Sequence, residues 1–298
     1  MKPQIAILGA GRVGRSLGRR LRLLGWKIGA VVTRSEAGAR RAVRFIGGGI
    51  PHGKLSRQLL ASPIILVATP DSVLPQVTDE LLRIGGEELR GKVVLHTSGA
   101  LDSRVLAPVR ACGAAVGSLH PLQSFSGVGV PPLQGRVFAI EGDAAALRVA
   151  RRIVRELEGT PVRIPCEKKP LYHAACALAA GHLLAVMEAA TRMMIAAGMK
   201  RREAQRALLP LTRQVLENFE RLGASAAWTG PLSRGDYAVI AAHAAALRKF
   251  PAQYGAAHEA LARLGALVLA RHPGKTLAAL DGVFGAGKRR KKSTTRKG

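Results

Sequence analysis

The sequence is poor in cysteine, aromatic residues and acidic residues, and each shortage excludes a class of protein. The three cysteines, Cys112, Cys166 and Cys176, are odd in number and show no Cys-x-x-Cys spacing. Neither a disulfide framework nor a zinc site is therefore indicated, and we expect no metal. Aromatic residues make up only 4% of the chain while hydrophobic residues make up 48%, so its cores must consist mainly of Ala, Leu and Val.

Long apolar runs are also missing. No continuous run reaches the roughly 18 residues that a membrane-spanning helix needs. The first residues lack the charged start, apolar centre and small-residue cleavage site of a secretory signal peptide. We therefore expect a soluble, cytoplasmic protein, which at 298 residues is long enough for two domains.

Acidic residues are scarce relative to basic ones. There are 19 Asp and Glu against 46 Lys and Arg, a formal net charge of +27. Much of the excess is arginine in predicted helices, where long side chains stay solvated while their stems cover apolar surface. A local block, Lys288–Lys292, occurs only at the end. Because such a block repels itself and buries nothing, we expect residues 285–298 to form a disordered tail, either simply solvated or binding polyanions weakly.

A glycine turn near the start carries the clearest motif. The apolar run Ile5–Leu8 leads into Gly9, Gly11 and Gly14 at G-x-G-x-x-G spacing, and a helical pattern follows at once. In a dinucleotide site the first glycine permits the turn, the second lets a pyrophosphate approach the backbone, and the third allows close helix packing. We expect the backbone from Gly9 to Gly14, including Arg12 and Val13, to bind the pyrophosphate at the helix start.

The second predicted strand, residues 27–33, ends in Thr33-Arg34-Ser35. An enzyme that selects NAD places Asp or Glu here to bind the ribose hydroxyls, but Glu36 comes late. Arginine can pair with a 2′-phosphate through two parallel hydrogen bonds. We therefore expect Thr33, Arg34 and Ser35 to bind the ribose end of NADP, the alternative being that Arg34 is a surface residue at a helix start.

Polar clusters follow three further predicted strands. The buried run 64–68 ends in Ala68-Thr69-Pro70, the run 92–95 in His96-Thr97-Ser98-Gly99, and the run 114–118 in the segment His120–Phe125. Ligands of open α/β sheets lie outside the carboxyl ends of the strands. We therefore expect Ala68, Thr69, Pro70 and Ser98 to contact the cofactor, with Ser98 and His120 close to each other.

The pattern changes beyond the predicted strand at 161–164. Long, alanine-rich helical periods follow from Pro170 to Arg271. We expect residues 1–166 to form an α/β domain with a doubly wound parallel sheet, residues 167–284 to form an all-helical domain, and the basic tail to follow.

These segments together resemble one family, in which a Rossmann-like domain precedes a helical domain of unknown function (domain of unknown function 2520). The resemblance runs from about Ile5 to Phe284 and rests on the glycine turn and five further segments: Ala68–Asp71, His96–Leu101, His120–Phe125, Tyr172–Ala175 and Thr229–Asp236. It implies an NADP-dependent oxidoreductase, a helical domain like the C-terminal domain of 6-phosphogluconate dehydrogenase, and a homodimer.

More distant similarity is to prephenate dehydrogenases, pyrroline-5-carboxylate reductases, ketopantoate reductases and deazaflavin-dependent NADP reductases. The His120-Pro121 pair is similar to the His-Pro-Met segment of prephenate dehydrogenases. By that resemblance His120 is the acid/base and Ser98 hydrogen-bonds the same substrate oxygen. The alternative is that His120 is a hydrogen-bonded structural histidine.

Other candidate residues lie in the predicted helices. His173 and His182 are nine residues apart, so a continuous helix turns them to opposite sides, and His173 is the better catalytic candidate. Thr229 and Arg234 are candidates for substrate binding, although Arg234 can instead pair locally with Asp236.

One departure from the family pattern limits this interpretation. Relatives carry Asn about eight residues after the His of Tyr-His-Ala-Ala, where this chain has Gly181. Three functions remain open: hydride transfer between NADP(H) and a small carbonyl, imine or hydroxy compound; a non-catalytic NADP-binding sensor or scaffold; and nucleic-acid binding through the tail.

Overall fold

The chain divides into two compact units, Met1–His182 and Leu183–Gly298. The computed structural model describes the backbone of residues 2–294 and the side chains of residues 2–285. The boundary lies 16 residues beyond the predicted one at residue 166, because helix α6 (Lys169–Ala177) buries Lys169 against the strands of the first unit.

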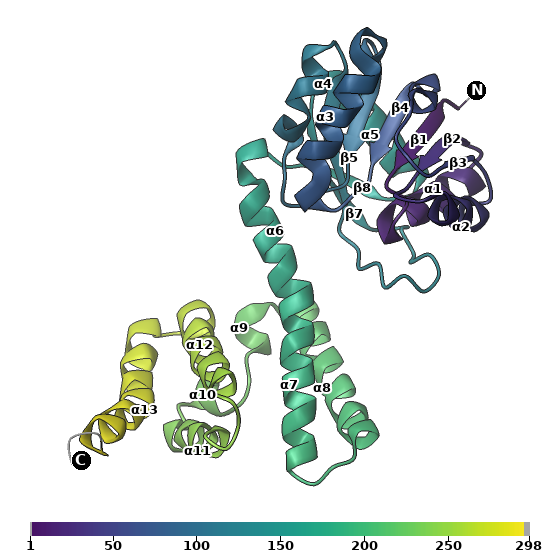
Figure 1. Cartoon of the computed structure of the whole chain (residues 1–298). Helices are drawn as coiled ribbons and strands as arrows, with labels where there is room; N and C mark the ends of the chain where they lie inside the picture. The colour runs from purple at the N-terminus through teal and green to yellow at the C-terminus, as the bar shows by residue number, and fades with distance from the viewer. Residues whose placement is uncertain (1, 295–298) are drawn as a thin grey trace. The chain divides into compact units, whose positions relative to one another are not determined.

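The first unit is an eight-stranded sheet covered by helices on both faces (Figure 1). The spatial order of the strands is β3-β2-β1-β4-β5-β6-β7-β8. Its strands are β1 (Gln4–Leu8), β2 (Lys27–Val32), β3 (Ile50–His52), β4 (Ile64–Val67), β5 (Val93–His96), β6 (Ala115–Pro121), β7 (Val137–Gly142) and β8 (Thr160–Arg163). The first six strands follow the doubly wound order of dinucleotide-binding folds, as the sequence predicts.

Alternate residues of these strands build two separate cores. Ile5 and Ile7 of β1 pack under α1 (Arg12–Leu23), α2 (Glu36–Ile46) and α5 (Ala144–Glu156). Ala6 and Leu8 face the other side, under α3 (Leu74–Gly85) and α4 (Ala107–Ala111). Successive strand residues point to opposite faces, so nearly continuous apolar runs are what a sheet covered on both sides requires.

Two details of the sheet differ from the predicted pattern. Residues Ile50–His52 form an edge strand that pairs with β2, although Pro51 and the three preceding glycines are typical of a loop. Strand β7 runs antiparallel to β6 and then pairs in parallel with β8. The remaining neighbouring pairs are parallel, so the sheet is mostly parallel.

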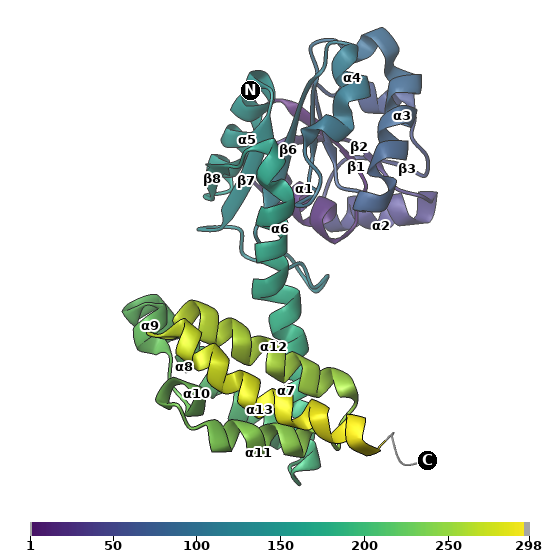
Figure 2. The same ribbon diagram turned by 90° about the vertical axis from the view of Figure 1, so that its left-hand side faces the viewer.

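The second unit is helical and has its own small core (Figure 2). Its helices are α7 (Leu183–Ala196), α8 (Arg201–Leu222), α9 (Ala224–Ala227), α10 (Pro231–Arg234), α11 (Tyr237–Leu247), α12 (Ala252–Leu269) and α13 (Pro273–Thr294). Ile240, Ala266 and Phe284 come together from α11, α12 and α13. Many other large apolar side chains of this unit are exposed.

Helix α13 continues into the segment for which the sequence predicts disorder. Leu277, Leu280 and Phe284 recur at helical spacing and pack on the core of the second unit, so the helix has an apolar side to bury. Its backbone runs to Thr294. The predicted tail therefore begins within this helix, and residues 295–298 lie outside the described part of the chain.

One helical stretch among the described residues, Cys166–Ala196, has the length and composition of a membrane span. Its best window has a mean hydropathy of 1.5, although polar residues, among them His173, His182 and Glu188, divide it into short apolar runs. Lys169 at its start is buried in the α/β unit, and Glu188 further along pairs with Arg192 and Arg201. These ionic contacts favour an apolar protein surface over a lipid-facing one.

Candidate active site

The glycine turn after β1 is built to admit a ligand at its middle position. Gly9 has φ +90°, and a Cβ there would lie 2.7 Å from the Thr69 nitrogen. A Cβ on Gly14 would lie 2.2 Å from the Gly9 carbonyl oxygen, so this position must lack a side chain for α1 to approach the sheet. A Cβ on Gly11 would meet no atom within 4 Å. The space above Gly11 is therefore open to a phosphate, while the turn around it is closely packed.

No side chain caps or neutralises the positive N-terminal end of helix α1. Gly11 is the N-cap residue, no side chain caps the helix, and its first turn holds no acidic residue. Backbone N–H groups at such a helix start attract anions. Arg12 is exposed beside this end, and Arg15 donates a hydrogen bond of 2.7 Å to the Gly127 carbonyl oxygen in the β6–β7 loop. The predicted residues Arg12 and Val13 thus lie where the sequence places them, in the first turn of α1.

The segment after β2 presents one exposed cation. The Ser35 hydroxyl accepts a hydrogen bond of 3.2 Å from the Gly38 N–H and caps α2, while Thr33 Oγ1 donates to the Ser35 carbonyl oxygen at 2.8 Å. Glu36 accepts from the Gly53 N–H at 3.0 Å and pairs with an arginine one turn later. Arg34 is exposed and has no partner among the described residues. Glu36 therefore already has partners, and the unpaired charged group at the end of β2 is the Arg34 guanidinium.

The turn after β4 carries an unsatisfied hydroxyl. Ala68 donates its N–H to the Leu8 carbonyl oxygen at 2.7 Å, which fixes this turn beside the glycine turn. Thr69 Oγ1 is buried and has no hydrogen-bond partner among the described residues. Pro70 follows and is exposed. A buried hydroxyl without a partner, in a turn that packs against the glycine turn, fits a cofactor site in which the ligand completes its hydrogen bonding.

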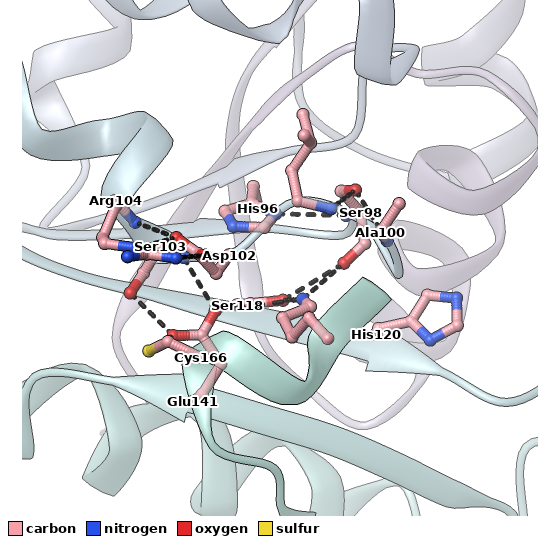
Figure 3. A network of polar contacts seen from close by, with 12 residues as sticks. His96, Ser98, Ala100, Asp102, Ser103, Arg104, Ser118, His120, Glu141 and Cys166 are labelled. Atoms are coloured by element: carbon pink, nitrogen blue, oxygen red, sulfur yellow. Dashed lines mark hydrogen bonds and ion pairs between the residues drawn. The ribbon is translucent and has the colours of Figure 1, made fainter. Parts of the chain in front are cut away.

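The loop after β5 is organised by Ser98. Its hydroxyl accepts hydrogen bonds from the N–H groups of Ala100 and Leu101, at 3.2 and 2.9 Å. Its carbonyl oxygen accepts from Ser118 Oγ at 3.2 Å and from Lys169 Nζ at 2.8 Å. Both oxygens of Ser98 therefore shape the loop (Figure 3). Its hydroxyl retains one proton with which to donate.

Beneath this loop lies a buried ion pair that the sequence did not indicate. Lys169 Nζ also donates to Ser118 Oγ at 2.5 Å and lies 3.8 Å from Glu141 Oε1. Glu141 accepts from the Ser103 N–H at 2.8 Å, the Ser103 hydroxyl at 2.7 Å and the Cys166 thiol at 3.0 Å. Burial lowers the pKa of Lys169 to about 8, and Glu141 opposes that shift. The network connects β5, β6, β7 and the start of α6.

His96 ends β5 as an uncharged residue. Its Nδ1 accepts a hydrogen bond of 3.2 Å from the Ser98 N–H, so the neutral ring carries its proton on Nε2. Burial lowers the pKa of His96 to about 3, and the Lys169 ammonium lowers it further. His96 therefore supports the loop from below.

His120 contacts Tyr172 of α6. The His120 Nδ1 and the Tyr172 hydroxyl oxygen lie 2.7 Å apart. Burial lowers the pKa of His120 to about 4, with further lowering by Lys169 and His173. Burial raises the pKa of Tyr172 above its usual range, so the hydroxyl keeps its proton and can either donate a hydrogen bond to Nδ1 or accept one from Nδ1–H. When Tyr172 donates, the neutral ring of His120 carries its own proton on Nε2.

His120, His173 and the Ser98-Gly99 loop meet at one point. The two imidazole rings are 6.0 Å apart and nearly perpendicular. A Cβ built on Gly99 would lie 2.7 Å from His120 Nε2 and 2.6 Å from His173 Cδ2. The loop backbone therefore packs directly against both rings, which requires glycine at position 99. The loop of Ser98 and Gly99 therefore lies beside His120, as the sequence leads us to expect, and the structure adds His173 to them.

Two predicted site residues lie in the helical unit, where they are described separately. Thr229 precedes α10, and Arg234 Nε lies 3.1 Å from Asp236 Oδ2 in an exposed ion pair. The local pairing left open by the sequence is therefore formed.

Position 181 lies in a π-helical turn, Leu178–His182, and a Cβ there would meet no atom within 4 Å. The helix through His173 and His182 is thus not regular, and their predicted placement on opposite sides does not apply to it.

Three residues of this site do not stand out in the sequence as site residues. Lys169 resembles its neighbour Lys168, and Tyr172 is distinguished only as part of the Tyr-His-Ala-Ala motif. Glu141 did leave a signal, because it is a lone carboxylate directly after the apolar strand residues Phe138–Ile140. A charged residue inside a buried strand predicts a buried partner.

Comparisons with known proteins match both parts of the chain. A family model described as a Rossmann-like domain matches residues 1–121, and a model described as a domain of unknown function (DUF2520) matches residues 136–264. No curated protein matches the sequence.

Several solved structures share the fold. A candidate NADP oxidoreductase from Bacteroides fragilis has a TM-score of 0.69 at 22% identity, covering 88% of this chain and 97% of its own. Protein TM1727 from Thermotoga maritima has a TM-score of 0.65 at 25% identity, covering 87% and 96%. A reductive aminase from Aspergillus terreus, solved with NADPH and ethyl-5-oxohexanoate, has a TM-score of 0.67 at 17% identity, covering 89% and 94%.

Proposed function

Because this chain belongs to the family of proteins that join a Rossmann-like domain to a domain of unknown function (DUF2520), we propose that it is an NADP-dependent oxidoreductase. It transfers a hydride between NADP(H) and a small carbonyl, imine or hydroxy compound. The observation that carries the proposal is the glycine turn, in which Gly11 opens to free space while Gly9 and Gly14 are tightly packed. That combination leaves room for a pyrophosphate at an uncapped helix start.

The residues present fit the cofactor. The backbone from Gly11 to Gly14 would hold the pyrophosphate, and the buried Thr69 hydroxyl would gain the partner that it lacks. Arg34 would pair with the 2′-phosphate, which favours NADP over NAD. The reductive aminase that shares the fold was solved with NADPH, which supports the same choice.

His120 supplies a hydrogen-bond donor in the proposed reaction. When bound, the reduced nicotinamide supplies the hydride. As negative charge develops on the substrate oxygen or nitrogen, His120 Nε2–H donates a hydrogen bond to it, and the proton that completes the product comes from solvent water. In this proposal Tyr172 donates to the opposite nitrogen, Nδ1, so His120 acts as a neutral hydrogen-bond donor. Protein groups that stabilise developing charge from a fixed position lower reaction barriers without reorganising.

The helical unit carries the surface through which we propose that two copies of the chain form a dimer. Leu184, Leu211 and Val268 are 71%, 61% and 61% exposed on α7, α8 and α12. Exposed apolar surface of this extent indicates a protein interface. We propose a soluble, cytoplasmic homodimer in which a second copy covers these side chains, and sedimentation should give about twice the chain mass of 31.4 kDa.

Turnover assays test the proposed activity. The protein and NADPH are incubated with a panel of ketones, aldehydes and cyclic imines, and NADP⁺ is tested with hydroxy acids, while absorbance at the nicotinamide band is recorded. We expect His120-dependent oxidation or reduction with at least one class. Tight NADPH binding without turnover on the whole panel would instead favour the sensor or scaffold function, for which the supporting observation is Gly181 at the position where relatives carry Asn.

A further inference from the structure

The helices on the two faces of the sheet differ sharply in charge. Helices α1, α2 and α5, which share one core, carry twelve arginines and two glutamates. The helices and turns that cover the other face carry five acidic residues and four arginines. The positive charge of the helices that cover the sheet is therefore concentrated on one face, which we call the arginine face.

Most of this charge is unpaired. Arg40 pairs with Glu36 and Arg152 with Glu156. The other ten arginines of the three helices have no acidic partner in the part of the chain that the structure describes. Charges that were placed only for solubility would gain from interspersed acids of opposite sign, and the arginine face has almost none.

Helix α5 shows how the charge is ordered. Arg148, Arg151, Arg152 and Arg155 recur at spacings of three and four residues, so they lie along one side of the helix. The opposite side buries Leu147, Ala150, Ile153 and Val154 against the sheet. The arginines therefore form an outward row about 10 Å long, at a rise of 1.5 Å per residue.

We propose that the arginine face binds the phosphate backbone of duplex nucleic acid, independently of sequence. Guanidinium forks match phosphate oxygens in two-point geometry, and a duplex presents one negative charge per about 1.7 Å of its axis. A lipid surface fits less well, because Leu23 is the one large exposed apolar side chain on the described parts of α1, α2 and α5. Peripheral membrane helices need an apolar side to insert.

Matched arginine variants test the proposal with the full-length protein. In the first variant Arg148→Gln, Arg151→Gln and Arg155→Gln remove three charges from the arginine face. In the second, Arg57→Gln, Arg83→Gln and Arg90→Gln remove three exposed charges from the other face of the same unit. Binding of a fluorescein-labelled 24-base-pair DNA duplex is measured by fluorescence anisotropy at several salt concentrations, and NADPH binding confirms that each variant is folded.

We expect the first variant to bind the duplex at least about tenfold more weakly, and the slope of log Kd against log salt to fall by about 2 to 3, since each lost phosphate contact removes about 0.9. The second variant should stay within about twofold of the unmodified protein. Equal losses in both variants would show that only total charge matters and would overturn the proposal. It would also be overturned if neutralising Lys288–Lys292 abolished binding while the first variant bound normally, or if vesicles containing phosphatidylserine bound more tightly than the duplex.

Discussion

The Tyr172 hydroxyl lies 2.7 Å from His120 Nδ1, and this contact determines which nitrogen of His120 carries the proton. We propose that Tyr172 is the donor, so that Nδ1 accepts and Nε2 keeps its hydrogen. The Gly99 backbone lies against that second nitrogen. Tyr172, which is not among the predicted catalytic residues, thus sets the tautomer of His120, which is.

Removing the Tyr172 hydroxyl should impair turnover but not cofactor binding. In Tyr172→Phe, His120 loses the donor that fixes its tautomer, and we expect kcat to fall about tenfold to a hundredfold. Nitrogen-15 NMR of His120 should show a mixture of tautomers where the unmodified protein shows one. Tyr254→Phe, which alters a tyrosine packed on Phe250 in the helical unit, is the control. Normal kcat together with an unchanged tautomer in Tyr172→Phe would refute the positioning role.

Acid should destabilise the first unit through His96. Its pKa in the folded state, about 3, lies below the ordinary value of 6.5, so the unfolded chain binds this proton more readily. The stability that His96 contributes is complete above pH 6.5 and is lost as the pH falls toward 3. Between pH 6.5 and 4.5 the loss should be on the order of 2 to 3 kcal/mol.

Thermal unfolding from pH 7 to 4.5 measures this effect. His96→Gln should flatten the dependence of Tm on pH, whereas the exposed His272→Gln should leave it unchanged. If the His96 variant kept the full acid sensitivity, the buried neutral state of His96 would not be its cause.

Lys169 and Glu141 should make coupled, non-additive contributions to the free energy of unfolding. Lys169→Met alone leaves a buried carboxylate, and Glu141→Gln alone leaves a buried ammonium, so each should cost about 3 to 5 kcal/mol. The double variant should cost less than the two singles added together, by about 1 to 3 kcal/mol. Urea unfolding is followed by Trp26, which is buried in the first unit, in a Trp228→Phe background. Additive costs would mean that the two residues do not interact.

Arg34 should discriminate between the two nicotinamide cofactors. In Arg34→Ala the partner of the 2′-phosphate is lost, and we expect NADPH to bind about tenfold to a hundredfold more weakly while NADH binding changes little. Arg41→Ala removes an exposed arginine from the helix that follows, α2, and should affect neither. Isothermal titration measures all four affinities, and equal weakening of NADPH and NADH by Arg34→Ala would contradict the assignment.

Elements that depend only on residues close together in the sequence could be predicted from the sequence. The strand Gln4–Leu8, the glycine turn and the start of α1 follow from an apolar run and three glycines, and the structure forms them as predicted. The buried Lys169 could not be distinguished from exposed Lys168, because only the folding of α6 onto β6 separates them. Likewise the strand at Ile50–His52 exists because β2 offers it an edge. Tertiary contacts of this kind leave little trace in a short window of sequence.

The glycine turn allows the most direct test of the account. A Cβ on Gly11 meets no atom within 4 Å, so Gly11→Ala should unfold at nearly the same temperature as the unmodified protein and yet obstruct the pyrophosphate. NADPH fluorescence titration is the measurement. We expect the unmodified protein to bind NADPH in the micromolar range, with NADH at least about tenfold weaker, and Gly11→Ala to lose NADPH binding. Failure of the unmodified protein to bind NADPH, or unaltered binding by a folded Gly11→Ala protein, would contradict the proposed cofactor site.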